Sequence, residues 1–283
     1  MKNWKEIIRH KQFRYLDHSK ENFFDQKAYT ALTSFAIDDV LALSVGGKNT
    51  APAIRLWVHP DTVVLGIPDA RIPFIEEGVE LLSEQGYQVV VRNSGGLAVA
   101  LDAGVLNISL ILPDVKHISI HDCYEAMVSF IQYMLRDLTN DIEAYEIVGS
   151  YCPGDYDLSI GGRKFAGISQ RRVKDGASIQ IYLDVEGKGI ERAALIRDFY
   201  SVGIKGAETK FSYPDVDPST MASLTELLGA KISVDGMKDR VLESLEHFSN
   251  MIVTDEFSAD ELEAFKTRYE QMVKRNEKIA GMQ

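Results

Sequence analysis

The residues most informative about the fold are Arg92-Asn93-Ser94-Gly95-Gly96-Leu97-Ala98-Val99, which directly follow the β-branched run 87–91. That run predicts a buried strand, and the glycines after it predict a tight loop at the strand end. Two adjacent glycines let the backbone approach a ligand closely and point its N–H groups at it. We therefore expect a ligand-binding loop here, with Arg92 beside it. No histidine and carboxylate follow or precede Ser94 in the chain order of a known catalytic triad, so we do not expect Ser94 to be a nucleophile.

The pattern on either side of this loop predicts an α+β domain spanning residues 28–249. Pro60-Asp61 separates the strand-like runs 54–59 and 62–67, which we expect to pair as a hairpin. Asp102-Ala103-Gly104 is expected to turn strand 97–101 into strand 105–112 of the same sheet. Residues 1–27 and 250–283 are expected to pack on the domain as extensions and not to form independent domains. The other predicted helices and strands are 28–45, 73–85, 121–138, 156–160, 163–170, 178–185, 190–201 and 220–228.

The last predicted helix has a complete start signal. Ser258 and Glu261 form an S-x-x-E capping box. An apolar stripe follows on one side of the helix, which favours docking on the body of the protein: Leu262, Phe265, Tyr269 and Met272.

Composition excludes several classes of protein. With 45% hydrophobic and 26% charged residues, the chain has the balance of a folded protein and not that of a disordered one. A net charge of −11 argues against a general nucleic-acid or membrane-surface binder. The start of the chain has no apolar segment of the kind that directs secretion, and no run approaches the roughly 20 residues needed to span a bilayer. With only two cysteines, a reducing cytoplasm is the expected location.

Neither a nucleotide nor a metal site is complete. Gly46-Gly47-Lys48-Asn49-Thr50 lacks the first glycine of a phosphate loop, and Asn49 separates its lysine from its threonine. No G-x-G-x-x-G follows a strand. His117, His121 and Cys123 have the residue types of a zinc site but no evident fourth ligand. No cofactor is therefore expected.

Cys152 differs from Cys123 because it lies in a turn-rich loop, Gly149-Ser150-Tyr151-Cys152-Pro153-Gly154-Asp155. Such a loop suits a nucleophile, although a thiol that merely sits in a loop is equally compatible with this pattern. Lys164 follows a Gly-Gly turn, from which a returning strand can bring its ammonium toward the thiol and favour the thiolate. A lysine at a strand end is not expected to be needed for the core.

Three segments in order resemble the biotin and lipoate protein ligase superfamily. Residues 92–99 look like its R-x-S-G-G-x-A-V motif, Leu106-Asn107-Ile108-Ser109 looks like its L-N-x-S motif, and residues 162–170 look like its G-[KR]-K-[IF]-x-G-x-[AS]-Q segment. The resemblance covers about residues 28–185. It implies a biotin/lipoate ligase-like catalytic domain with mixed and antiparallel sheets flanked by helices.

The departures from the superfamily pattern are also informative. ATP-dependent lipoate ligases usually carry Asn-Asp before the lysine strand, whereas this chain has Tyr156-Asp157. The loop around Cys152 resembles instead that of octanoyl amidotransferases of Gram-positive bacteria. That resemblance implies octanoylated glycine-cleavage H protein as donor and lipoyl domains of 2-oxoacid dehydrogenase E2 subunits as acceptors. The alternatives are an octanoyltransferase that uses acyl carrier protein, an ATP-dependent lipoate ligase, and a catalytically dead acyl-protein binding module.

The mechanism implied by the resemblance is ping-pong, with the acyl group held as a thioester on Cys152. Lys164 is expected to polarise the acyl carbonyl. No neighbouring histidine is apparent as a general base. The expected substrate-binding residues are Arg92, Ser94, Gly95, Gly96, Asp157 and Gly167.

A basic cluster after the cysteine loop suggests where an acidic carrier docks. We expect Lys164 to point inward and the others outward, although a solvated charge run fits the pattern equally well. The cluster consists of Arg163, Lys164, Arg171, Arg172 and Lys174.

Overall fold

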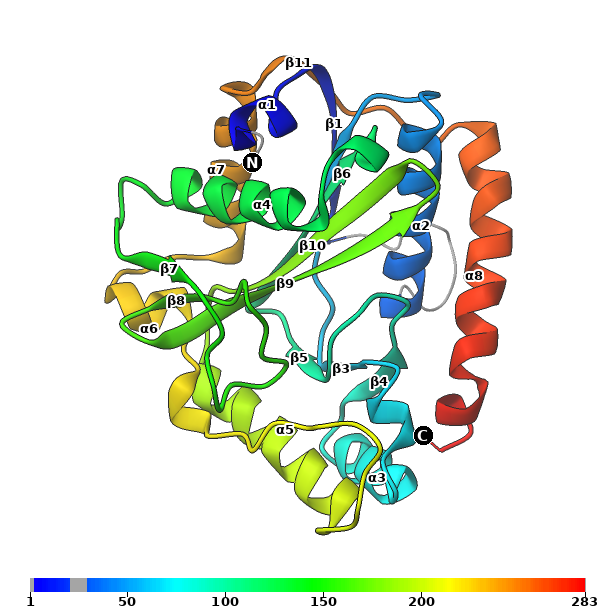
Figure 1. The fold of residues 1–283 in the computed structure, drawn as a ribbon, viewed down its shortest axis with the longest axis vertical. Coiled ribbons are helices and arrows are strands. Elements are labelled where there is room, and N and C mark those ends of the chain that lie inside the picture. The colour runs from blue at the N-terminus through cyan, green and yellow to red at the C-terminus, as the bar shows by residue number, and fades with distance from the viewer. Residues whose placement is uncertain (1–2, 21–29, 283) are drawn as a thin grey trace.

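A large mixed sheet forms the centre of the fold (Figure 1). The computed structural model describes residues 3–20 and 30–282. The strand order in the large sheet is β11-β1-β2-β6-β10-β9-β8-β7. β1 runs parallel to both of its neighbours, and the other pairs are antiparallel. The strands are β1 (His10–His18), β2 (Ala53–Trp57), β6 (Val105–Leu112), β7 (Ile142–Ala144), β8 (Leu158–Ile160), β9 (Arg163–Val173), β10 (Gly176–Asp184) and β11 (Ser249–Val253).

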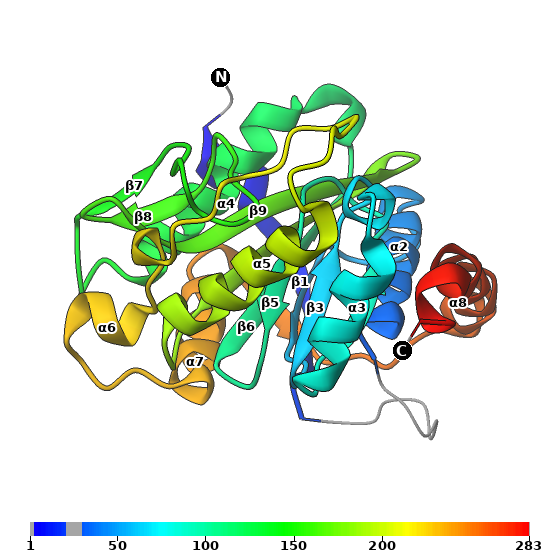
Figure 2. The ribbon, with the colours of Figure 1, turned by 90° about the horizontal axis from the view of Figure 1, so that it is seen from below.

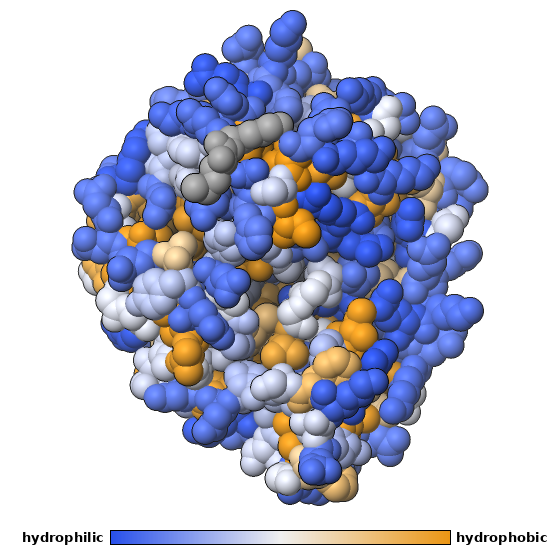
Figure 3. All heavy atoms as spheres, viewed as in Figure 1, coloured by the Kyte–Doolittle hydropathy of each residue, from blue (hydrophilic) through white to orange (hydrophobic). Residues whose placement is uncertain are grey.

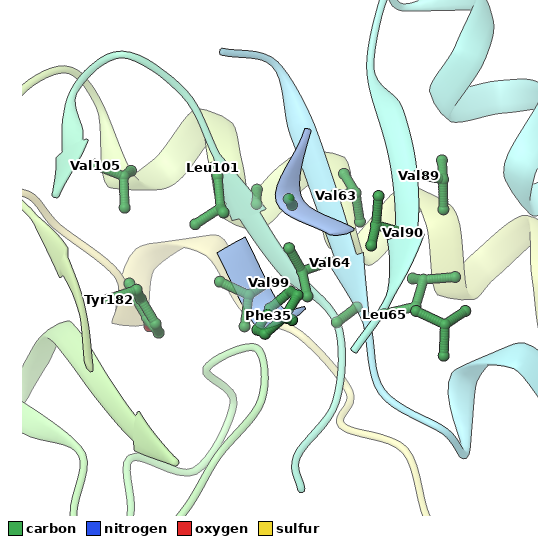
Figure 4. Packing of buried hydrophobic residues seen from close by; sticks show 14 of the residues in the cluster. Phe35, Val63, Val64, Leu65, Val89, Val90, Val99, Leu101, Val105 and Tyr182 are labelled. Atoms are coloured by element: carbon green, nitrogen blue, oxygen red, sulfur yellow. The ribbon is translucent and has the colours of Figure 1, made fainter. Parts of the chain in front are cut away.

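A small sheet of order β4-β3-β5 packs against the large one. In it β3 (Thr62–Leu65) is parallel to β4 (Gln88–Val91) and antiparallel to β5 (Val99–Leu101). Figure 4 shows Val64 and Val99 of this sheet beside Phe35 of a neighbouring helix, with Tyr182 of β10 nearby. The expected α+β class with mixed and antiparallel sheets is therefore confirmed.

Helices cover both faces of the large sheet. The central strand β6 is buried at all of its positions, because Val105 and Ile111 face one hydrophobic cluster and Leu106 and Ile108 face another. Figures 1 and 2 show the arrangement of the helices around the sheets. Their bounds are α1 (Trp4–Ile8), α2 (Ala31–Gly46), α3 (Ile75–Glu84), α4 (Ile120–Met134), α5 (Gly189–Ile204), α6 (Leu224–Leu228), α7 (Val234–Glu246) and α8 (Ala259–Ala280), with short 3₁₀ turns η1 (Asp69–Arg71), η2 (Val115–His117) and η3 (Pro218–Thr220).

The predicted hairpin is wrong. Strands β2 and β3, on either side of Pro60-Asp61, belong to different sheets, and so do β5 and β6 on either side of residues 102–104. Strands buried at every position, such as β2 and β3, carry no alternation that identifies a partner. The two short turns therefore carry the chain from one sheet to the other instead of closing hairpins.

Both terminal segments contribute to the core structure. His10–His18, within the expected N-terminal extension, is a strand inside the large sheet, and β11 pairs with it. At the other end, the capping box of Ser258 and Glu261 is confirmed, and α8 packs along α2 (Figure 1). Asn276 of α8 hydrogen-bonds both backbone groups of Val91, at the end of the strand that leads into the glycine-rich segment. Among the described residues, no helix is long and apolar enough to cross a membrane.

Candidate active site

Two loops meet between the sheets. We call residues 92–98, between β4 and β5, the glycine loop, and residues 145–157, between β7 and β8, the cysteine loop. The backbone N–H of Leu97 donates to Sγ of Cys152 at 3.0 Å, and Nη2 of Arg92 lies 3.4 Å from the same sulfur. Both donors would stabilise negative charge on the sulfur when it attacks a carbonyl or leaves one. The structure thus brings together two segments that the sequence separates by 55 residues.

The backbone at this contact is specialised. Gly96 has a φ of +103°, and a Cβ at this position would lie 2.9 Å from Sγ of Cys152 and against the Arg92 guanidinium. Only glycine allows this close approach. Cys152 itself has a φ of 46°, in the left-handed region that non-glycine residues rarely occupy. Residues held in such conformations cluster at functional sites.

A buried Asp69–Tyr200 pair supports the glycine loop. The hydroxyl of Tyr200 donates to Oδ1 of Asp69 at 2.8 Å and accepts from the N–H of Ala98 at 3.3 Å. The other carboxylate oxygen of Asp69 accepts from the N–H of Gly66 at 2.7 Å. Burial raises the pKa of Asp69 to about 6. Sequence reasoning missed this pair because no local motif connects positions 69 and 200.

Lys164 fixes the cysteine loop from the buried side of the loop. Its side chain is fully buried, so the expectation of a lysine not needed for the core is wrong. Its ammonium lies 2.9 Å from Oδ1 of Asp157 and donates to the carbonyl oxygens of Tyr151 and Cys152 at 2.9 and 2.8 Å. The hydroxyl of Ser150 is a further acceptor at 3.3 Å. Four acceptors occupy all three ammonium hydrogens, so in this structure Lys164 positions the loop that carries the thiol.

Asp157 and Gly167 complete the support around Lys164. Oδ2 of Asp157 accepts from the N–H groups of Ile147 and Gly154, so one carboxylate ties both ends of the loop to the lysine. Burial raises the pKa of Asp157, and the neighbouring Lys164 opposes that rise. A Cβ at Gly167 would lie 2.8 Å from the ring of Tyr182 and 3.4 Å from Cε of Lys164.

An apolar pocket opens beside the thiol. Its volume is about 290 Å³, and Figure 3 shows the molecule hollowed near the middle of the face in view. Phe35, Trp57 and Leu101 are among its apolar lining residues, which suits an acyl chain. Ser94 is buried beside the pocket, with its hydroxyl 3.4 Å from that of Ser169. The predicted site residues on the pocket wall are Arg92, Gly95, Gly96, Cys152, Asp157 and Gly167.

His117, His121 and Cys123 have the residue types of a zinc site. Within residues 3–20 and 30–282, no cluster of three or more His, Cys, Asp or Glu side chains could hold a metal ion. Cys123 is buried in α4, and burial raises the pKa of its thiol. His121, however, lies on the wall of the Cys152 pocket, which the sequence did not reveal.

The basic cluster does not form the expected docking patch. Lys164 does point inward, but Arg163 stands at the start of β9 and the other basic residues at its far end, about 30 Å along an 11-residue strand. Arg171 pairs with Asp39 at 3.0 Å. Arg172 donates to the carbonyl oxygens of Val115 and Ile118. Reversing the charges of these arginines would therefore disturb internal contacts and would not report on carrier docking.

Comparison with known proteins agrees with this arrangement. Residues 30–246 match the family described as Lipoyl protein ligase A/B catalytic domain. Octanoyl-[GcvH]:protein N-octanoyltransferase of Oceanobacillus iheyensis is 65% identical, over 98% of this chain and 99% of that protein. Lipoyl-[GcvH]:protein N-lipoyltransferase of Listeria monocytogenes is 46% identical, over 96% of this chain and 97% of that protein. A solved lipoate-protein ligase A bound with ATP is 18% identical with a TM-score of 0.68, and the match covers 92% of this chain and 95% of that one.

Proposed function

This chain belongs to the lipoyl protein ligase A/B catalytic domain family, and we propose from this premise that it transfers an octanoyl group between proteins through Cys152. The observation that carries the proposal is the Cys152 thiol at an apolar pocket, with the Leu97 N–H and the Arg92 guanidinium directed at its sulfur. The pocket suits an alkyl chain, and the donors suit a sulfur that becomes negatively charged during exchange.

We infer that the reaction consists of two exchanges at one carbonyl. The sulfur of Cys152 attacks the octanoyl-lysine amide of a donor protein, the C–N bond breaks, and a thioester remains. The lysine amine of an acceptor then attacks the thioester, and the C–S bond breaks. In this scheme Leu97 N–H and Arg92 stabilise the sulfur as nucleophile and leaving group, and Lys164 with Asp157 fixes the loop that presents it.

The names of the relatives support GcvH, the glycine-cleavage H protein, as the donor. The relative at 65% identity is named for octanoyl transfer and the Listeria relative at 46% for lipoyl transfer, which favours octanoyl here. As acceptors we propose lipoyl domains of 2-oxoacid dehydrogenase E2 subunits, acting with this protein in the cytoplasm. The alternatives with acyl carrier protein as donor, or with ATP-dependent ligation, have less support from these relatives.

Transfer is expected to need neither ATP nor a metal ion. Exchange of one lysine amide for another breaks and forms the same kind of bond, so no activation by a nucleotide is required. The measurement is octanoylation of a lipoyl domain by octanoylated H protein, before and after depletion of ATP and addition of a chelator. Equal rates are expected. Transfer that stops when ATP is removed would identify a ligase instead.

A further inference from the structure

Both exchanges need a group that carries a proton, and Arg92, Asp157 and Lys164 do not supply it. A free lysine side chain has a pKa near 10.4, so only roughly one acceptor amine in 10³ is uncharged at pH 7. That amine must lose a proton to form an amide, and the donor lysine must gain one to leave. A group with access to the thioester has to accept and return this proton.

The charged groups that contact the thiol, or the loop that carries it, are unsuited to this task. Arg92 cannot give up a proton, and the ammonium of Lys164 is already enclosed by four acceptors. The carboxylate of Asp157 is committed to Lys164 and to two backbone N–H groups. Of the six histidines, all of which lie in the described ranges, His121 is the one on the pocket wall.

His121 is held at the mouth of the pocket by the cysteine loop itself. It is exposed in the first turn of α4, and its Nδ1 lies 3.1 Å from the hydroxyl of Tyr156, four residues after Cys152. Tyr156 is fixed in turn by stacking on Tyr124, with ring centroids 4.9 Å apart. Within the described part of the chain, Nε2 of His121 makes no hydrogen bond. When Nδ1–H donates to the Tyr156 oxygen, Nε2 carries a lone pair free to accept a proton.

We propose that His121 is the proton-transfer residue of both exchanges, a role that rests on the acyl transfer through Cys152 proposed above. In the first exchange, protonated Nε2 gives its proton to the donor lysine nitrogen as the C–N bond breaks. In the second, neutral Nε2 takes a proton from the acceptor nitrogen as the new C–N bond forms and the C–S bond breaks. The proton given up in the first exchange leaves with the donor lysine, the imidazole is neutral while the thioester exists, and the second exchange returns a proton to it as the sulfur leaves as a thiolate.

Several charged and titratable groups surround this imidazole. Asp122 and Glu125 of α4, together with Asp155, lie close enough to act electrostatically on Tyr156. The groups on the pocket wall, apart from the thiol, are Arg92, Tyr124, Asp155, Tyr156, Asp157 and Tyr182.

The test measures the second exchange alone. Octanoyl-Cys152 is prepared with p-nitrophenyl octanoate, and its transfer to a lipoyl domain is followed in a single turnover. His121→Asn is expected to slow this step about 10²-fold, with an unchanged half-saturating concentration of lipoyl domain. Added imidazole should restore part of the rate to His121→Ala.

His117→Asn is the matched control, because His117 is exposed, only four residues away and outside the pocket. It should transfer at the wild-type rate. Equal rates for His121→Asn and His117→Asn would overturn the proposal. So would a loss confined to lipoyl-domain binding that added imidazole does not restore, since that result would make His121 a docking residue. Because the enzyme is loaded chemically, a failure of the H protein to act as donor would count against the proposed function and not against His121.

Discussion

Cys152→Ser is expected to abolish octanoyl transfer, with a rate loss of at least about 10³-fold. The serine hydroxyl is a far weaker nucleophile than a thiolate at neutral pH. It would sit in the same loop, with the Leu97 N–H and Arg92 still directed at it, so binding of the carrier proteins should survive. The measurement is the rate of lipoyl-domain octanoylation, together with the melting temperature of the variant.

Cys123→Ser is the matched control for that loss. Cys123 is buried in α4, in the hydrophobic cluster on the face of the large sheet opposite α2. A serine at this position is therefore expected to cause a small loss of stability. Its transfer rate at a temperature where it is folded should match the wild type. Residual transfer by Cys152→Ser near the wild-type rate, or loss of transfer by a well-folded Cys123→Ser, would show that the wrong thiol has been assigned.

Lys164→Met is expected to lose both stability and transfer. The side chain is fully buried, and its ammonium lies 2.9 Å from the equally buried carboxylate of Asp157. Removal of one member of such a pair leaves an uncompensated charge and costs about 3–5 kcal/mol of the free energy of unfolding. The loop that carries Cys152 also loses its contacts at the carbonyl oxygens of Tyr151 and Cys152. Chemical denaturation and the transfer rate measure the two effects separately.

The double variant Lys164→Met with Asp157→Asn separates charge from position. It removes both charges at nearly constant volume, so much of the lost stability should return. Transfer should stay low, because the amide cannot replace the ammonium contacts that fix the cysteine loop. A double variant that regained transfer along with stability would show that the pair acts only on folding.

The stability of Lys164→Met should also depend on pH in a defined direction. Burial raises the pKa of Asp157 in the folded protein, and Lys164 opposes this rise, so the pKa should increase further in the variant. A carboxyl group with a higher pKa in the folded state stabilises the fold at low pH and loses that contribution as pH rises. The deficit of the variant relative to the wild type should therefore shrink as pH falls below neutrality. A deficit that grew on acidification would contradict a buried, unpaired Asp157.

Much of the candidate site could be predicted from the sequence because its parts are local motifs. The glycine loop, the cysteine loop and the strand with Lys164 are each an uninterrupted stretch of sequence, and their residue types indicate their chemistry. Partners across the fold were harder to predict. The prediction that β2 pairs with β3 was wrong, because strands buried on both faces lack the alternation of polar and apolar residues that would indicate a neighbouring strand.

Three further features depend on tertiary contacts that no local pattern encodes. Asp69 meets Tyr200 under the glycine loop, 131 residues away in the sequence. His121 reaches the pocket only because α4 begins beside the cysteine loop, where Tyr156 meets its ring. Lys164 was expected to point inward and act on the acyl carbonyl without being needed for the core, and its role in fixing the loop that carries the thiol became visible only with its buried acceptors.

The most direct measurement of the central claim is the mass of the protein after mixing with octanoylated H protein in the absence of any acceptor. Thioester catalysis predicts a mass increase of one octanoyl group, mapped by peptide analysis to Cys152, absent from Cys152→Ser and lost on addition of a lipoyl domain no more slowly than turnover. Transfer that proceeds at full rate with no adduct, or with an adduct on Cys123 or a lysine, would contradict it.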